Sequence, residues 1–126
     1  MNPIKEWHEI VKSGKTENLS SIIDSDCIFY SPVVFTPQKG KELTIKYLSA
    51  AALVFGDDSF KYIKEIINEK NACLEFELKL NGIEINGVDL ISWNDKNKIS
   101  EFKVLIRPLK GVQLIHELMG GTLEQI

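Results

Sequence analysis

The sequence is poor in cysteine and has no long apolar run, and each shortage excludes a class of protein. Its two cysteines, Cys27 and Cys73, lie far apart in apolar runs typical of strands. Neither has another cysteine or a histidine at the spacing of a metal-binding motif. We therefore expect two buried free thiols, a disulfide only if the protein is exported, and no metal site. No apolar run approaches the ~20 residues of a membrane span, and the segment after Met1 is charged. We expect no membrane anchor, no signal peptide and a cytoplasmic location.

An excess of basic residues is also missing. The 15 lysines and arginines are outnumbered by 18 acidic residues, which gives a formal net charge of -3. Such a surface repels polyanions, so a nucleic-acid partner is not expected. Neither a phosphate-binding glycine loop nor a serine-nucleophile motif occurs, and we expect no cofactor. With 126 residues, 44% of them hydrophobic, the chain fits one globular domain with a real core.

The first half of the sequence predicts three helices and one short strand. Apolar residues at helical spacing predict a helix between Pro3 and Gly14 and a second one, capped by Thr16, that ends at residues 24–26. Residues 27–30 favour a strand, and the two prolines that follow predict a loop. Residues 41–55 predict the longest helix before the C-terminal segment. Its expected apolar face consists of Leu43, Tyr47, Ala51 and Val54.

The second half changes to the period of a strand. Residues 60–67 alternate loosely and residues 72–80 alternate cleanly, and Asn81-Gly82 favours a tight type I′ turn. Residues 83–93 and 98–107 predict two more strands around a polar turn. Residues 109–126 predict a C-terminal helix interrupted at Gly120-Gly121. Helices followed by antiparallel strands predict an α+β fold in which the helices pack on one face of a curved sheet.

Strand alternation also assigns side chains to faces of the sheet. The inward residues are expected to be Leu74, Phe76, Leu78 and Leu80 in one strand and Phe102, Val104 and Ile106 in the last. In the strand over residues 83–93, Ile85, Ile91 and Trp93 select a face that brings Asp89 inward with them.

Asp89 is therefore an acidic residue on an apolar face. An ionised carboxylate buried without partners costs several kcal/mol, so we expect Asp89 to find hydrogen-bond donors or to keep its proton with a raised pKa. Both outcomes are typical of a functional site. The alternative is that Asp89 bonds a backbone amide or a tyrosine hydroxyl and only fixes the sheet.

The order of the elements, together with G-x-D-L-x-x-W-N-D-x-x-K-I-x-E-F-x-V from Gly87 onward, resembles the NTF2-like superfamily, and most of all its SnoaL-like group of small bacterial proteins. The resemblance extends to about Pro108, and residues 109–126 are a helical extension that some members have. It implies a single domain over residues 1–126, shaped as a cone-like α+β barrel with a deep pocket. It also implies a homodimer through the outer sheet face. Val88, Leu90 and Leu105 form a modest apolar stripe on that face, which is either the dimer contact or ordinary surface.

Members include ketosteroid isomerases, polyketide cyclases, dehydratases, epoxide hydrolases and non-catalytic binding modules, so the fold alone does not define the function. Asp89 matches the isomerase aspartate that stays protonated and donates a hydrogen bond. The isomerase general base falls on Ser31 and its oxyanion tyrosine on Trp7. A serine is a poor base without a partner, and an indole can only donate a hydrogen bond. The second aspartate of the epoxide hydrolases falls on Val104. Neither reaction is therefore expected to proceed here with the residues that those relatives use.

What the resemblance implies is a pocket with Asp89 at its depth, which suits a flat, mostly apolar or aromatic ligand with one polar atom. The expected lining is Trp7 and Tyr47 as walls, Tyr30 and Ser31 at the rim, and Leu74, Phe76, Leu78, Phe102, Val104 and Ile106 as the floor. His8 is within reach of the mouth, although a histidine on a helix surface is usually only solvated. Three hypotheses stay open: a cyclase, isomerase or dehydratase that uses Asp89 as acid/base or donor, a non-catalytic binding module, and a dimeric scaffold with a filled pocket.

Overall fold

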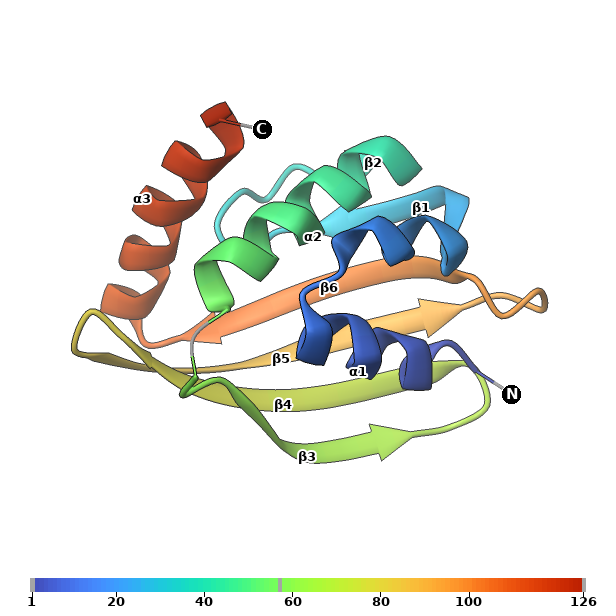
Figure 1. The fold of residues 1–126 in the computed structure, drawn as a ribbon, viewed down its shortest axis with the longest axis horizontal. Coiled ribbons are helices and arrows are strands. Elements are labelled where there is room, and N and C mark those ends of the chain that lie inside the picture. Colours follow the sequence, from blue (N-terminus) through green and yellow to red (C-terminus); the bar gives the residue numbers. More distant parts are fainter. Residues whose placement is uncertain (1, 57, 126) are drawn as a thin grey trace.

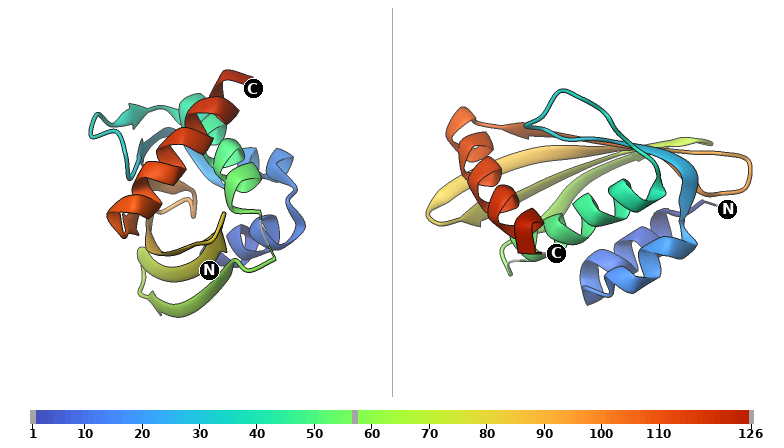
Figure 2. Two further views of the ribbon diagram at one scale, coloured as in Figure 1. Left: turned by 90° about the vertical axis from the view of Figure 1, so that its left-hand side faces the viewer. Right: turned by 90° about the horizontal axis from the view of Figure 1, so that it is seen from above.

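The computed structural model describes residues 2–56 and 58–125, which form an α+β fold with helices on the concave face of a curved sheet (Figures 1 and 2). In chain order the elements are α1 (Ile4–Ser13), the 3-10 helix η1 (Thr16–Ser21), β1 (Ile23–Tyr30), β2 (Gln38–Lys39), α2 (Lys41–Phe55), β3 (Lys61–Ile67), β4 (Asn71–Leu80), β5 (Ile83–Trp93), β6 (Ile99–Arg107) and α3 (Leu109–Gln125). The expected fold class is confirmed.

The six strands form one sheet in the order β2-β1-β6-β5-β4-β3. All neighbours are antiparallel except β1 and β6, which run parallel and bring Phe29 opposite Phe102. The sheet curves strongly but does not close, so the barrel has an open side between the edge strands β2 and β3 (Figure 2). The helices α1 and α2 lie inside this curvature.

The strands of the second half follow the predicted alternation. Asn81 and Gly82 have φ angles of 49° and 79°, as the predicted type I′ turn between β4 and β5 requires. Asp89 pairs with Leu74 on β4 and with Val104 on β6, in the middle of the sheet. A register shift at Ser92 and Trp93 lets Ile99 and Phe102 of β6 both point inward, although they are an odd number of residues apart.

The second predicted helix is wrong in type and length. Residues 16–21 form only the 3-10 helix η1, and residues 24–26, expected to end a helix, lie in β1 instead. The reason is tertiary pairing, because Ile23 lies beside Ile99 of β6 and both side chains are buried. The spacing of Leu19, Ile22 and Ile23 suits a helix in isolation, but the sheet provides a better partner for the last of them.

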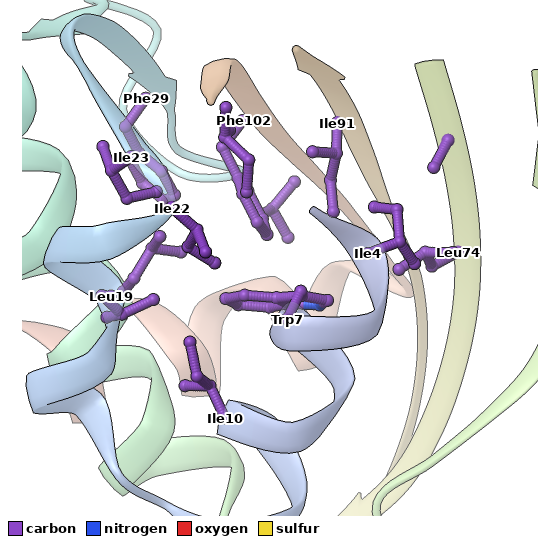
Figure 3. Close-up of a cluster of buried hydrophobic side chains, with 14 of the residues drawn as sticks. Ile4, Trp7, Ile10, Leu19, Ile22, Ile23, Phe29, Leu74, Ile91 and Phe102 are labelled. Carbon is purple, nitrogen blue, oxygen red and sulfur yellow. The ribbon is translucent and has the colours of Figure 1, made fainter. Parts of the chain in front are cut away.

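Helix α2 has the predicted bounds, but its buried face is shifted from the predicted one and shares only Val54 with it. Thr44, Leu48, Ala50 and Val54 are buried, whereas Leu43 is exposed. The Thr44 hydroxyl donates to the Gly40 carbonyl at 2.9 Å, which satisfies a polar side chain at a buried position. Helix α1 contributes Ile4, Trp7 and Ile10 to the core, and Figure 3 shows Trp7 between Ile10 and the phenyl ring of Phe102.

Helix α3 continues through Gly120 and Gly121, where an interruption was predicted. It packs against α2 and buries Ile115. Both thiols are free, as expected; Cys27 is buried, whereas Cys73 is only partly buried. No helix in the described part of the chain is long and apolar enough to cross a membrane.

Candidate active site

A cavity of about 650 Å³ lies between α1, α2 and the concave face of the sheet. Most of its walls are apolar or aromatic. Its deeper lining comes from Trp7 of α1, Leu48 and Phe55 of α2, Phe60 and Tyr62 at the start of β3, Phe76 of β4, Asp89 of β5, and Phe102 and Val104 of β6. A volume of this size is typical of sites that bind small organic molecules.

Asp89 is the one carboxylate in the deep part of this lining, among the residues that the structure describes. It is 6% exposed, and its strand neighbours Leu74 and Val104 have no polar side-chain atoms. The Tyr62 hydroxyl donates a hydrogen bond of 2.6 Å to Asp89 Oδ2. None of residues 2–56 and 58–125 donates to the second oxygen, Oδ1, so this atom is available to a molecule in the cavity.

Tyr62 receives a hydrogen bond as well as making one. The indole Nε1 of Trp7 donates to the Tyr62 hydroxyl oxygen at 3.0 Å. A chain of two hydrogen bonds therefore runs from α1 through the edge strand β3 to Asp89 in the middle of the sheet. Trp7 is oriented for this bond by its packing in the core, where its ring meets Phe102 edge-on at 4.8 Å between centroids.

Burial changes the proton affinity of both acidic groups in this chain. Removal of solvent raises the pKa of Asp89 to about 7, although the hydrogen bond from Tyr62 lowers it. Burial also raises the pKa of Tyr62 well above its ordinary value, and the adjacent Asp89 raises it further. Tyr62 thus keeps its proton at neutral pH, whereas Asp89 exchanges one readily.

The mouth of the cavity is polar. His8 of α1 and Glu65 of β3 form a partly exposed pair with 2.8 Å between Nε2 and Oε1, and the His8 ring meets Tyr62 edge-on. Lys61 and Asp58 complete this rim. In the described part of the chain no three His, Cys, Asp or Glu side chains gather into a group able to hold a metal ion.

The structure brings five of the predicted site residues to the cavity: Trp7, Phe76, Asp89, Phe102 and Val104. Leu74 and Leu78 are buried in the core instead, and Ile106 packs against the core without lining the cavity. Their inward orientation was predicted. Alternation along a strand does not show how deep an inward side chain lies, and in a curved sheet other side chains cover some of the inward positions.

Three residues expected at the walls or rim do not line the cavity. Tyr30 lies under the ammonium group of Lys103, 4.8 Å from the ring centroid, on the other face of the sheet from Phe29. The Ser31 hydroxyl accepts the amide hydrogens of Val33 and Val34 and so holds the loop after β1. Tyr47 stacks on Phe29 at 5.2 Å.

Tyr62 was not predicted as a site residue. The signal for it was the alternation of Phe60 and Tyr62 with Lys61, which places two aromatic rings on one face of a strand. This signal was weak because the pairing of β3 with β4 shifts between Tyr62 and Lys64, so the alternation ends after one step.

Comparisons with solved structures identify the fold. A steroid delta-isomerase from Pseudomonas aeruginosa superimposes with a TM-score of 0.92 at 28% identity, covering 97% of this chain and 89% of that one. An uncharacterised bacterial protein with a cystatin-like fold from Silicibacter pomeroyi gives a TM-score of 0.87 at 28% identity, with coverage of 96% and 85%. A SnoaL-like polyketide cyclase from Jannaschia gives 0.64 at 12%, with coverage of 82% and 78%.

The fold is therefore that of the NTF2-like proteins, with a curved sheet around a cavity and an added C-terminal helix. An NTF2-like protein from Mesorhizobium loti shares this fold with a TM-score of 0.72 at 15% identity, covering 83% of this chain and 88% of that one. A scan against protein-family models finds no match, and neither does a search of the curated proteins.

Proposed function

We propose that the protein is an enzyme that moves a proton on a small, mostly apolar molecule bound in the cavity, with Asp89 as the general acid/base. The observation that carries this proposal is one buried carboxyl at the depth of an apolar cavity, whose Oδ1 has no donor from the described residues. Its pKa of about 7 is close to the value at which a group both removes and returns protons at neutral pH.

The chemistry that such a site supports is proton transfer at a carbon next to a carbonyl. The ionised Asp89 removes the proton from the carbon, and the electrons of the broken C–H bond move into the carbonyl group to form an enolate. Asp89, now neutral, returns the proton to the same carbon or to a conjugated one. The names of the solved structures, a steroid delta-isomerase and a polyketide cyclase, support a reaction of this class.

The test uses 2-tetralone, a flat ketone with two fused rings and one polar atom. In D₂O the enzyme should exchange the α-hydrogens of 2-tetralone for deuterium, which proton NMR follows as loss of their signal. The substitution Asp89→Asn should slow this exchange about 100-fold or more, because general acid/base catalysis is worth that much. Asp26→Asn, which changes an exposed carboxyl of β1 outside the cavity lining, is the matched control and should leave the rate unchanged.

A second candidate function is a binding module that holds an apolar molecule without changing it. The observation that favours it is Ser31, which occupies the place of the isomerase base in the resemblance and is engaged by the loop. Under this alternative 2-tetralone quenches the fluorescence of Trp7 on binding, yet its α-hydrogens exchange equally slowly with the wild-type protein and with Asp89→Asn. That result would contradict the enzymatic proposal.

We also propose that two copies of the chain pair through the outer face of the sheet. Leu105 is half-exposed there and lies opposite Val88, next to Leu90, so three apolar side chains meet on a face that is otherwise mostly polar or charged.

A further inference from the structure

Trp7 is the first member of the hydrogen-bond chain that ends at Asp89, and its chemistry fixes the direction of the whole chain. An indole N–H donates a hydrogen bond and cannot accept one. In the contact of 3.0 Å between Trp7 Nε1 and the Tyr62 hydroxyl, the tyrosine oxygen must therefore be the acceptor. The single proton of Tyr62 is left for its other neighbour.

That neighbour is Asp89 Oδ2, at 2.6 Å. The Tyr62 hydroxyl makes no other hydrogen bond with the described residues. The nearby His8 meets the Tyr62 ring only edge-on, and its Nε2 is engaged by Glu65. A proton on Asp89 Oδ2 would point at an oxygen that already accepts from Trp7, and the proton of Tyr62 would then have no acceptor. A buried hydroxyl whose proton has no acceptor destabilises the folded protein, so this arrangement is disfavoured.

We propose that Trp7 is a positioning residue, which makes Tyr62 a donor to Asp89 Oδ2 and thereby confines the exchangeable proton of Asp89 to Oδ1, the oxygen open to the cavity. This inference rests on the proposed function and adds the atom through which the proton moves. A ligand therefore meets an acceptor at Oδ1 when Asp89 is ionised and a donor at the same atom when Asp89 is neutral. The ligand class that fits both states carries a carbonyl oxygen beside an acidic C–H.

The experiment measures the pKa of Asp89 in the ligand-free protein by ¹³C NMR of its labelled carboxyl group. The titratable groups around the chain are Tyr62 and Glu65 of β3, His8 of α1, and Asp58 and Lys61 at the mouth, and every variant keeps them except Tyr62→Phe. Tyr62→Phe should raise the pKa of Asp89 by about 1 or more, because the ionised form loses a charge-assisted hydrogen bond. Trp7→Phe should raise it by about 0.5, since a Tyr62 hydroxyl that no longer accepts from Trp7 is a weaker donor to Asp89.

Trp93→Phe is the matched control. Trp93 lies on the same strand as Asp89 and is buried, as Trp7 is. Its indole donates to the Glu69 carbonyl at 3.0 Å, so Trp93→Phe removes one tryptophan and one hydrogen bond, just as Trp7→Phe does. It should change the pKa of Asp89 by no more than about 0.2. Replacement of Trp7 by benzothienylalanine, which exchanges the N–H for sulfur and keeps the ring shape, should reproduce the effect of Trp7→Phe in a fully folded protein.

The two proposals fail in different ways. Equal pKa values of Asp89 in the wild-type protein and in both Trp7 variants would overturn the role of Trp7 and leave the proposed function standing. A pKa of Asp89 near ~4 in the wild-type protein would contradict the proposed function itself. A rise in both Trp7 variants with no change in Trp93→Phe supports the positioning role.

Discussion

At the scale of single residues, the protein maintains an acid in surroundings that oppose its ionisation. Asp89 has one hydrogen-bond donor from the described residues, and its neighbours on both adjacent strands are aliphatic. One donor does not replace the hydration of a carboxylate, and the pKa therefore rises to about 7. Burial of Asp89 therefore lowers the free energy of unfolding at neutral pH and provides an acid that titrates in that range.

The raised pKa of Asp89 predicts that the free energy of unfolding depends on pH. Between pH ~4 and pH ~7 the folded state keeps a proton on Asp89 that the unfolded chain has released, so the free energy of unfolding falls as the pH rises. The expected slope from this group is about 1.4 kcal/mol per pH unit within that window, and it disappears above pH ~7. Urea denaturation at several pH values measures it.

Asp89→Asn is the comparison that isolates this contribution, because all other titrating groups are retained. The difference in the free energy of unfolding between the variant and the wild-type protein should shift by about 2–4 kcal/mol in favour of the variant from pH 4 to pH 8. A difference that stays constant with pH would mean that Asp89 titrates at the same pH in both states.

The sequence was sufficient to place Asp89 but not its partners. Alternation along β5 and the burial of Ile85, Ile91 and Trp93 leave only one inward face for Asp89, and this argument needs no other part of the chain. Tyr62 reaches Asp89 across β4, a contact that depends on the order of strands in the sheet and on their curvature. Such long-range geometry cannot be obtained from local periodicity.

At the scale of the elements, the sequence predicted correctly those strands that bury one face in the core and leave the other face outside it. The strands β4, β5 and β6 have one apolar and one polar face, and the predicted faces are the observed ones. The prediction of the second helix was wrong because apolar residues at positions 22 and 23 suit either a helix or a strand. Pairing of Ile23 with β6 selects the strand. The buried face of α2 was shifted because Thr44 satisfies its own hydroxyl within the helix.

Two glycines allow a test of the elements, with opposite signs expected. Gly82 has φ 79° in the turn between β4 and β5, where a side chain is strained, so Gly82→Ala should reduce the free energy of unfolding by about 1 kcal/mol. Gly120 lies inside α3 with open space around the position of a Cβ, so Gly120→Ala should raise it by about 0.5–1 kcal/mol. Urea denaturation of both variants measures the changes, and destabilisation by Gly120→Ala would show that α3 is interrupted in solution.

At the scale of the whole molecule, the curved sheet separates two surfaces with different tasks. The concave face holds the cavity and the proposed proton transfer, whereas the convex face carries the proposed contact between two copies. A charged residue at the centre of that contact should separate the copies. The cavity is on the other face, so its chemistry should survive the separation.

Sedimentation velocity at micromolar concentration checks this arrangement. The wild-type protein should sediment as a dimer and Leu105→Lys as a monomer, because a lysine there would be buried against apolar side chains. Leu53→Lys introduces the same charge at an exposed leucine of α2, away from the sheet, and should remain a dimer. A wild-type monomer would contradict the proposed contact.

The parallel pairing of β1 with β6 has a consequence for how the chain acquires its structure. During synthesis β1 emerges early, and until β6 is complete its only neighbour in the sheet is the two-residue strand β2. The apolar side chains of β1 therefore remain exposed until β6 is made. Pairing of the two strands closes a long loop, which is entropically costly and slow. A nascent chain stalled before residue 99 should expose Ile23 and Phe29 to chaperones, although most of the cavity wall has already been made.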